Sequence, residues 1–193
     1  MSVLLELANG IASGRVHVVD LTQTLSPEFP GISLPPEMGQ AWPFRIEEVS
    51  RYDERGPAWY WNNFSCGEHT GTHFDAPVHW VSGKDLPNNA TDSIPPERFI
   101  GPAFVIDCSQ EAARDADFLQ TRDFIEKWEA KHGRIAPRSW VLMRTDWSKR
   151  HDPAEYQNYD EEGQHTPGPD VEAVKFLVNE RDVLGFGTES IGT

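Results

Sequence analysis

The chain has 193 residues, of which 38% are hydrophobic, and this length allows one domain with a sizeable core but is short for two. Its formal net charge of −14 at pH 7 argues against nucleic acid or an anionic membrane as a partner, because phosphate binding needs clustered Lys and Arg. The two cysteines, Cys66 and Cys108, are too few for a disulfide framework.

The N-terminus predicts an amphipathic helix. Apolar residues recur at helical spacings from Leu4 to Ala12, and Gly14 is placed to end the helix. This apolar stripe would either join the core or contact another subunit. Residues 1–14 lack the basic start of a signal peptide, and no stretch reaches the roughly 18 apolar residues of a membrane span, so the cytoplasm is the expected location.

Strands are expected next. Val16–Leu21 is predicted to be a strand, and a proline-rich loop follows over residues 27–43. Two further strands are predicted at Phe44–Val49 and Trp59–Phe64.

Three tryptophans near the middle of the chain have two interpretations. Trp59, Trp61 and Trp80 either form an aromatic wall for a planar substrate or fill the core. As an aromatic wall, they are the candidate substrate-binding residues.

The densest group of chemically active side chains lies between Glu68 and Trp80. Three of the seven histidines and one aspartate fall within eleven residues, at His69, His73, Asp75 and His79. From His73 onward apolar residues alternate with polar ones or proline, which predicts an extended strand with one packing face. Gly71 supplies the backbone freedom for a turn that folds His69 back toward this strand.

These side chains form a candidate ligand set for a metal ion. His73 and Asp75 lie two residues apart in an extended segment and can converge on one ion, with His69 as the third ligand. This donor set suits zinc or manganese, and three ligands leave room for a water molecule. A turn at Pro77 would bring His79 to the edge of the site as a general acid or base. The alternative is a strand with solvent-facing histidines.

The second half of the chain alternates strands and helices. Strands are predicted at Ala103–Asp107, Trp140–Arg144 and Val183–Phe186, with helices over Thr121–Lys131 and from Pro169 onward. The second helix is expected to pack one apolar face, made of Val171, Val174, Leu177 and Val178. This order is typical of parallel βαβ units, so the expected fold is α/β, a single domain with a mixed sheet and flanking helices.

Two polar segments in this half have open interpretations. Thr145 and Asp146 leave the end of a predicted parallel strand, where ligand sites of α/β proteins lie, and either face a pocket or form a structural turn. The acidic segment Asp160–Glu162, near His165, either binds a cation or forms a solvated loop.

The segment GEHTGTHFDAPVHW resembles the HxGTHxDxPxH signature of the metal-dependent cyclase-like hydrolases, a family that contains bacterial kynurenine formamidases and isatin hydrolases. Outside this signature, further matches occur at Asp20–Ser26, Gly83–Asp85, Arg144–Trp147 and Gly185–Thr193. The resemblance covers nearly the whole chain and is strongest to the isatin hydrolase branch.

The resemblance implies a swivelling β/β/α fold. It implies that His69, His73 and Asp75 bind one divalent ion, Mn²⁺ or Zn²⁺, and that His79 is the catalytic base. The implied substrates are small aromatic formamides or cyclic amides, and the implied assembly is a homodimer. Family members continue past the point that matches Thr193, so the chain is expected to lack the family's C-terminal part.

The sequence therefore predicts a metal-dependent amidohydrolase that acts on a small aromatic cyclic amide or formamide, as isatin hydrolases do. Two alternatives remain. One is a kynurenine formamidase, and the other is a truncated relative that binds metal without turnover.

Overall fold

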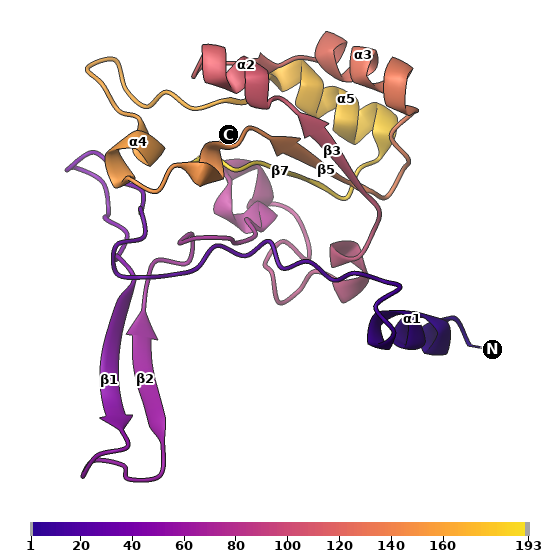
Figure 1. Ribbon diagram of the computed structural model, residues 1–193. Coiled ribbons are helices and arrows are strands. Elements are labelled where there is room, and N and C mark those ends of the chain that lie inside the picture. Colours follow the sequence, from indigo (N-terminus) through magenta and orange to yellow (C-terminus); the bar gives the residue numbers. More distant parts are fainter. Residues whose placement is uncertain (1, 192–193) are drawn as a thin grey trace.

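A computed structural model describes residues 2–191, so the last two residues of the predicted family match, Gly192 and Thr193, lie outside the described part. At its centre is a parallel sheet with the strand order β3-β5-β7, formed by Ala103–Asp107, Trp140–Arg144 and Gly185–Gly187 (Figure 1). The three predicted strands and their parallel pairing are confirmed, since the intervening helices return the chain to the same edge of the sheet.

Three helices cover one face of this sheet (Figure 1): α2 (Ser109–Arg114), α3 (Arg122–His132) and α5 (Val171–Arg181). The Thr121 side chain accepts a hydrogen bond from Phe124 N at 3.2 Å and caps α3, as the sequence predicts. The core lies between helices and sheet and contains Ile106, Cys108, Ile125, Ile135, Val141, Met143, Ala173, Phe176 and Leu177.

The predicted apolar face of α5 is wrong in part. Leu177 is buried, but its buried neighbours are Ala173 and Phe176, whereas Val171, Val174 and Val178 are exposed. The helix carries apolar residues on more than one side, so spacing alone does not say which side meets the sheet. The helix also begins after Asp170, whose carboxylate accepts from Ala173 N at 2.6 Å, and Pro169 belongs to a short strand.

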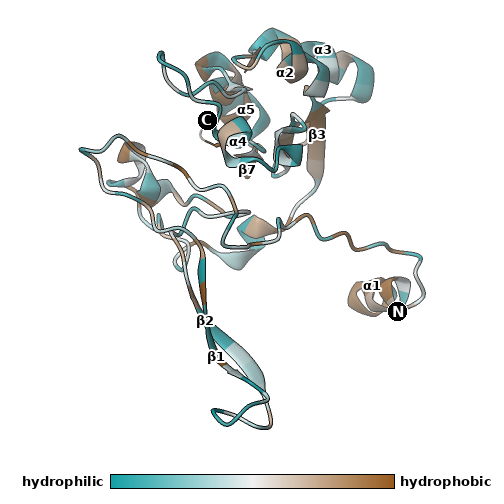
Figure 2. Ribbon diagram, turned by 60° about the vertical axis from the view of Figure 1, so that its left-hand side comes forward, coloured by the Kyte–Doolittle hydropathy of each residue, from teal (hydrophilic) through white to brown (hydrophobic). Residues whose placement is uncertain are grey.

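The N-terminal part is open in shape. Helix α1 (Val3–Ala12) stands clear of the sheets, and strands β1 (Arg45–Arg51) and β2 (Tyr60–Ser65) form an antiparallel hairpin that projects from the body (Figures 1 and 2). The helix and both strands are confirmed. The apolar stripe of α1 does not join the core, because Leu4 and Leu5 are 77% and 51% exposed.

The strand predicted at Val16–Leu21 is wrong. The segment is extended, but it pairs with no strand among residues 2–191, and its apolar side chains at Val18, Val19 and Leu21 are more than 70% exposed. A strand needs a hydrogen-bonded neighbour, which the local sequence pattern cannot supply.

Short elements complete the described chain. Strands β4 (Leu119–Gln120) and β6 (Gly168–Pro169) pair in parallel, and helix α4 (Pro153–Gln157) is capped by the Asp152 carboxylate. These elements were not predicted, because each is too short to show a periodic pattern. No helix among residues 2–191 is long and apolar enough to cross a membrane.

Candidate metal centre

The site begins with a turn over residues 68–72, as predicted. Gly71 has φ +71°, a left-handed conformation that a side chain strains, and a Cβ added there would lie 2.5 Å from Leu25 Cδ2. Glycine is therefore required at this position both for the backbone conformation and for the close approach of Leu25.

After the turn the chain is extended from His73 to Ala76 and then enters a 3-10 turn, η1, at Pro77–His79. The strand predicted from His73 is wrong, because residues 73–76 pair with no strand in the described part of the chain, whereas the predicted turn at Pro77 is confirmed. Proline lacks the amide that a sheet ladder needs and its fixed φ suits the first position of such a turn. His79 N donates to Ala76 O at 2.9 Å, which closes the turn.

The packing face of the extended segment is short. The Phe74 ring lies edge-on to Phe99 and Trp140, at centroid distances of 4.9 and 6.2 Å, and Ala76 is buried. These contacts anchor the segment against the face of the central sheet opposite the helices, since Trp140 alternates with the core residue Val141 on β5. Val78, beyond Pro77, is exposed.

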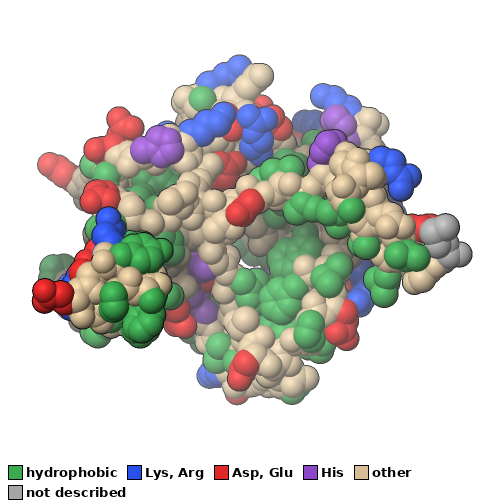
Figure 3. All heavy atoms as spheres, turned by 60° about the horizontal axis from the view of Figure 1, so that its bottom comes forward, with side chains coloured by type: hydrophobic (Ala, Val, Ile, Leu, Met, Phe, Trp, Pro, Cys, Tyr) green, Lys and Arg blue, Asp and Glu red, His purple; other side chains and the backbone are tan. Residues whose placement is uncertain are grey.

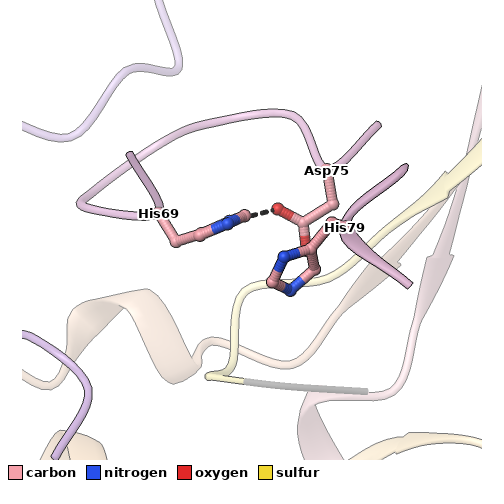
Figure 4. A group of neighbouring side chains, drawn as sticks. All are labelled: His69, Asp75 and His79. Carbon is pink, nitrogen blue, oxygen red and sulfur yellow. Dashed lines mark hydrogen bonds and ion pairs between the residues drawn. The ribbon is translucent and has the colours of Figure 1, made fainter. Parts of the chain in front are cut away.

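The candidate ligands converge on one carboxylate oxygen. Asp75 Oδ1 lies 2.6 Å from His69 Nδ1 and 3.1 Å from His73 Nε2 (Figure 4 draws His69, Asp75 and His79). The three side chains are each about one third exposed. A site with this exposure is shielded on one side and open to a small ligand on the other.

The 3-10 turn brings His79 into the same group. Its ring centroid is 4.0 Å from that of His69, and His69, Asp75 and His79 each offer one ligand atom within 4.8 Å of the other two. His79 is therefore placed at the cluster itself, and geometry alone allows it to be a ligand as well as a base.

The donor set fits a divalent metal ion. Imidazole nitrogens and a carboxylate oxygen converge from one short segment, and His73 Nδ1 contacts Gly71 O at 2.7 Å. A backbone carbonyl at Nδ1 makes that nitrogen the N–H donor and leaves Nε2 with the free electron pair, directed at Asp75. Metal-ligating histidines are commonly oriented in this way.

The three tryptophans proposed for substrate binding are not brought together. The Trp80 ring lies edge-on to that of His79 at 4.8 Å and borders the cluster. Trp59 and Trp61 belong to the hairpin, and β2 begins at the hairpin's outer end (Figure 1). Both are more than half exposed, so they do not fill the core of this chain.

Two polar residues that the sequence analysis did not single out make hydrogen bonds in or near the candidate site. One lies in the turn itself, and the other contacts the loop after β5. Thr72 Oγ1 accepts from Gln23 N at 2.9 Å, and the Glu189 carboxylate holds the loop after β5. The only signal for them in the sequence was their position inside segments that resemble the cyclase-like hydrolases.

Comparison with known proteins agrees with that resemblance. Residues 19–193 match the family model described as "Putative cyclase". Isatin hydrolase of Roseibium aggregatum is 47% identical over 194 residues, which covers 100% of this chain and 73% of that protein.

Solved structures of isatin hydrolases have the same fold. Isatin hydrolase A from Ralstonia solanacearum matches with a TM-score of 0.97 at 57% identity, covering 100% of this chain and 74% of its own. An isatin hydrolase bound to the product analogue thioisatinate matches with a TM-score of 0.96 at 46% identity, covering 100% and 75%. The predicted α/β fold is confirmed, and the chain belongs to the cyclase family of metal-dependent hydrolases.

Proposed function

We propose that this chain hydrolyses the amide bond of isatin or a closely related small aromatic cyclic amide, using one divalent metal ion. The likeness to isatin hydrolases bears out the prediction of a hydrolase that acts on a carbon–nitrogen amide bond. The observation that carries the proposal is the convergence of His69, His73 and His79 on Asp75 in a chain with such relatives.

In this proposal His69, His73 and Asp75 hold the ion. When bound, a divalent metal supplies Lewis acidity for the substrate carbonyl and lowers the pKa of a water molecule. His73 Nδ1 keeps its proton on Gly71 O, so that Nε2 stays available as a ligand. Mn²⁺ and Zn²⁺ are the proposed ions, because both accept imidazole and carboxylate ligands.

His79 is proposed as the proton carrier. Its ring borders the cluster, and a neutral imidazole there would take the proton of the attacking water and return it to the leaving amide nitrogen. Trp80, whose ring contacts His79, is proposed to pack against the flat substrate beside the reacting bond.

A homodimer is proposed for the assembly. The accessible surface is 13586 Å², whereas a folded monomer of 21.8 kDa exposes about 9,000 Å². The excess includes the projecting hairpin and the apolar N-terminal stretch, and Figure 3 shows hydrophobic side chains over much of one face. Trp59 and Trp61, both exposed on this hairpin, are proposed to bind substrate in the site of the other copy. The cytoplasmic location stays a prediction.

The deciding experiment combines elemental analysis of dialysed protein with a substrate panel. We expect about one equivalent of metal per chain and hydrolysis of isatin, with N-formylkynurenine turned over poorly. Preference for N-formylkynurenine would replace the proposal with a kynurenine formamidase. Metal without turnover of either compound would favour a non-catalytic metal-binding relative.

A further inference from the structure

Three of the four family-like segments outside the metal turn, which we define as residues 68–76, are linked by hydrogen bonds directly or through Ser148, and the chemistry proposed above uses none of the three. They are Asp20–Ser26, Arg144–Trp147 and the stretch from Gly185 to Glu189. The last two include the carboxyl ends of β5 and β7, which are neighbours in the parallel sheet, so the residues that follow these strands meet at one edge. The structure connects all three segments to the metal turn by hydrogen bonds.

Glu189 is the residue of this hydrogen-bonded series that lies farthest from the metal turn, and its carboxylate accepts hydrogen bonds from the loop after β5. Its Oε1 accepts from Thr145 N at 2.9 Å and from Asp146 N at 3.2 Å. Its Oε2 accepts from Ser148 N at 3.2 Å and from Ser148 Oγ at 2.5 Å. One carboxylate thus satisfies three backbone amides of the loop after β5, including the left-handed Asp146.

The loop held by Glu189 contacts the N-terminal strap, which we define as residues 20–25. Gln23 Nε2 donates to Ser148 O at 3.5 Å, a long bond, and Gln23 N donates to Thr72 Oγ1 at 2.9 Å. Leu25 of the same strap covers Gly71. The strap therefore lies between the Glu189 loop and the metal turn and contacts both.

Thr72 is the residue at which this series of hydrogen bonds reaches the metal turn. It stands between Gly71, whose carbonyl orients the His73 ring, and His73 itself. A shift of the Thr72 hydroxyl would move the carbonyl and the ligand on either side of it. The orientation of a ligand's imidazole is a determinant of metal affinity.

We propose that Glu189 is a positioning residue for the metal turn and that it acts through Ser148, Gln23 and Thr72. The inference rests on the proposed function, because it assigns Glu189 to the support of the same metal turn. Its alternative is a local role, in which Glu189 caps the short turn at Trp147–Lys149 and stabilises the fold without any effect on the ligands.

The test compares Glu189→Gln with wild type and with Asp170→Ala. Glutamine keeps one acceptor oxygen and loses the other, so half of the Glu189 contacts are lost with little change in volume. Asp170→Ala removes a carboxylate that caps α5 and has no bond to the strap, so it lowers stability without touching the relay. Each protein is assayed for Mn²⁺ and Zn²⁺ dissociation constants by chelator competition and for amide exchange in the metal-free state.

We expect Glu189→Gln to weaken metal binding about tenfold, at the lower end of what loss of an outer-shell contact costs. We also expect faster amide exchange over residues 20–26 and 68–76. Asp170→Ala should leave metal affinity and amide exchange over these residues unchanged at a temperature where the variant stays folded. At the other end of the relay, Thr72→Ser should retain wild-type affinity and Thr72→Val should lose it, since only serine keeps the acceptor oxygen.

The inference is overturned if Glu189→Gln leaves either metal affinity or amide exchange over residues 68–76 at the wild-type value, as Asp170→Ala is expected to do, whatever its effect on the stability of the fold. It is also overturned if Thr72→Val binds metal as tightly as wild type. A wild-type protein that binds no metal would refute the proposed function, whereas unchanged exchange in the metal-free Glu189→Gln variant refutes the relay alone.

Discussion

At the scale of single residues, the roles of the three histidines around Asp75 have to be told apart. His73 and His79 both lie at the cluster, one 3.1 Å from Asp75 Oδ1 and the other in the compact group with His69 and Asp75. The proposed assignment of His73 as ligand and His79 as base comes from the family resemblance, and the orientation of the His73 ring by Gly71 O supports it.

Alanine variants separate these roles. His73→Ala is expected to lose the metal, because it removes one of three ligands, and His79→Ala is expected to keep the metal while losing turnover by about 10²- to 10⁴-fold, the usual contribution of a general base. Metal content and isatin hydrolysis are measured on the same samples. If His79→Ala loses the metal and His73→Ala keeps it, the ligand set is His69, Asp75 and His79 instead.

Gly71 gives a second residue-level prediction. Gly71→Ala forces a side chain into a left-handed backbone, at a cost of roughly 1–2 kcal/mol, and against Leu25. We expect weaker metal binding together with a lower midpoint of urea unfolding. Gly133→Ala is the control, since Gly133 also has a positive φ but ends α3 with open space around it. If both variants lose stability and neither loses metal affinity, Gly71 matters for the stability of the fold but not for metal binding.

The sequence was sufficient to predict that the three histidines and the aspartate of the candidate site come together, because they lie within eleven residues and need only a turn to meet. The strand predicted from the alternation after His73 did not form, because the segment finds no pairing partner among residues 2–191, but the turn predicted at Pro77 did. Glu189 is separated from Ser148 by 41 residues, and no local pattern reveals a contact at that distance.

At the scale of elements, one loop is held by a histidine between two carboxylates. His165 Nδ1 lies 2.8 Å from Asp117 Oδ2, and Nε2 lies 3.0 Å from Asp160 Oδ1. Both contacts need a proton on the ring nitrogen, so the hydrogen bonds to Asp117 and then to Asp160 raise the pKa of His165 above its usual value near 6.5. Through His165, the acidic segment is connected to Asp117, two residues before β4.

The His165 contacts predict a pH-dependent contribution to stability. Because the pKa of His165 is raised on folding, the contribution is fully present below the unfolded pKa of about 6.5 and is lost as pH rises through the higher folded pKa. We expect the difference in urea midpoint between wild type and His165→Gln to be largest near about pH 5.5–6 and to vanish well above the folded pKa. A constant difference across this range would contradict the prediction, and His151→Gln, at an exposed histidine, is the control.

Elements were predicted where their own residues carry the signal. The strands of the central sheet are short apolar runs, and Thr121 caps α3 as its sequence indicates. The errors at residues 16–21 and on α5 have a different origin, because a strand and a buried helix face are both defined by what they contact.

At the scale of the whole molecule, the distribution of apolar surface is the main unexplained feature. Val18, Trp61 and Phe64 are 76%, 53% and 72% exposed, and a two-stranded hairpin is marginal unless it packs on something. Exposed apolar areas of this extent mark interfaces. They are the basis for the proposed homodimer.

The homodimer predicts that a charge on the hairpin disrupts assembly. Phe64→Asp places a carboxylate in the proposed interface, where its desolvation is unfavourable, so we expect the sedimentation profile to shift from dimer to monomer. In a protein that is monomeric anyway, the same change at an exposed residue would leave the profile unaltered. Val171→Asp is the control, because Val171 is 67% exposed in the first turn of α5, where a negative charge is tolerated. If the hairpin aromatics also complete the site of the other copy, Phe64→Asp is expected to lose isatin hydrolysis together with the dimer while it keeps its metal. Mixing this variant with an excess of His79→Ala protein is then expected to restore activity. Each mixed dimer has one intact site, made of the metal site of the Phe64→Asp copy and the hairpin of the His79→Ala copy.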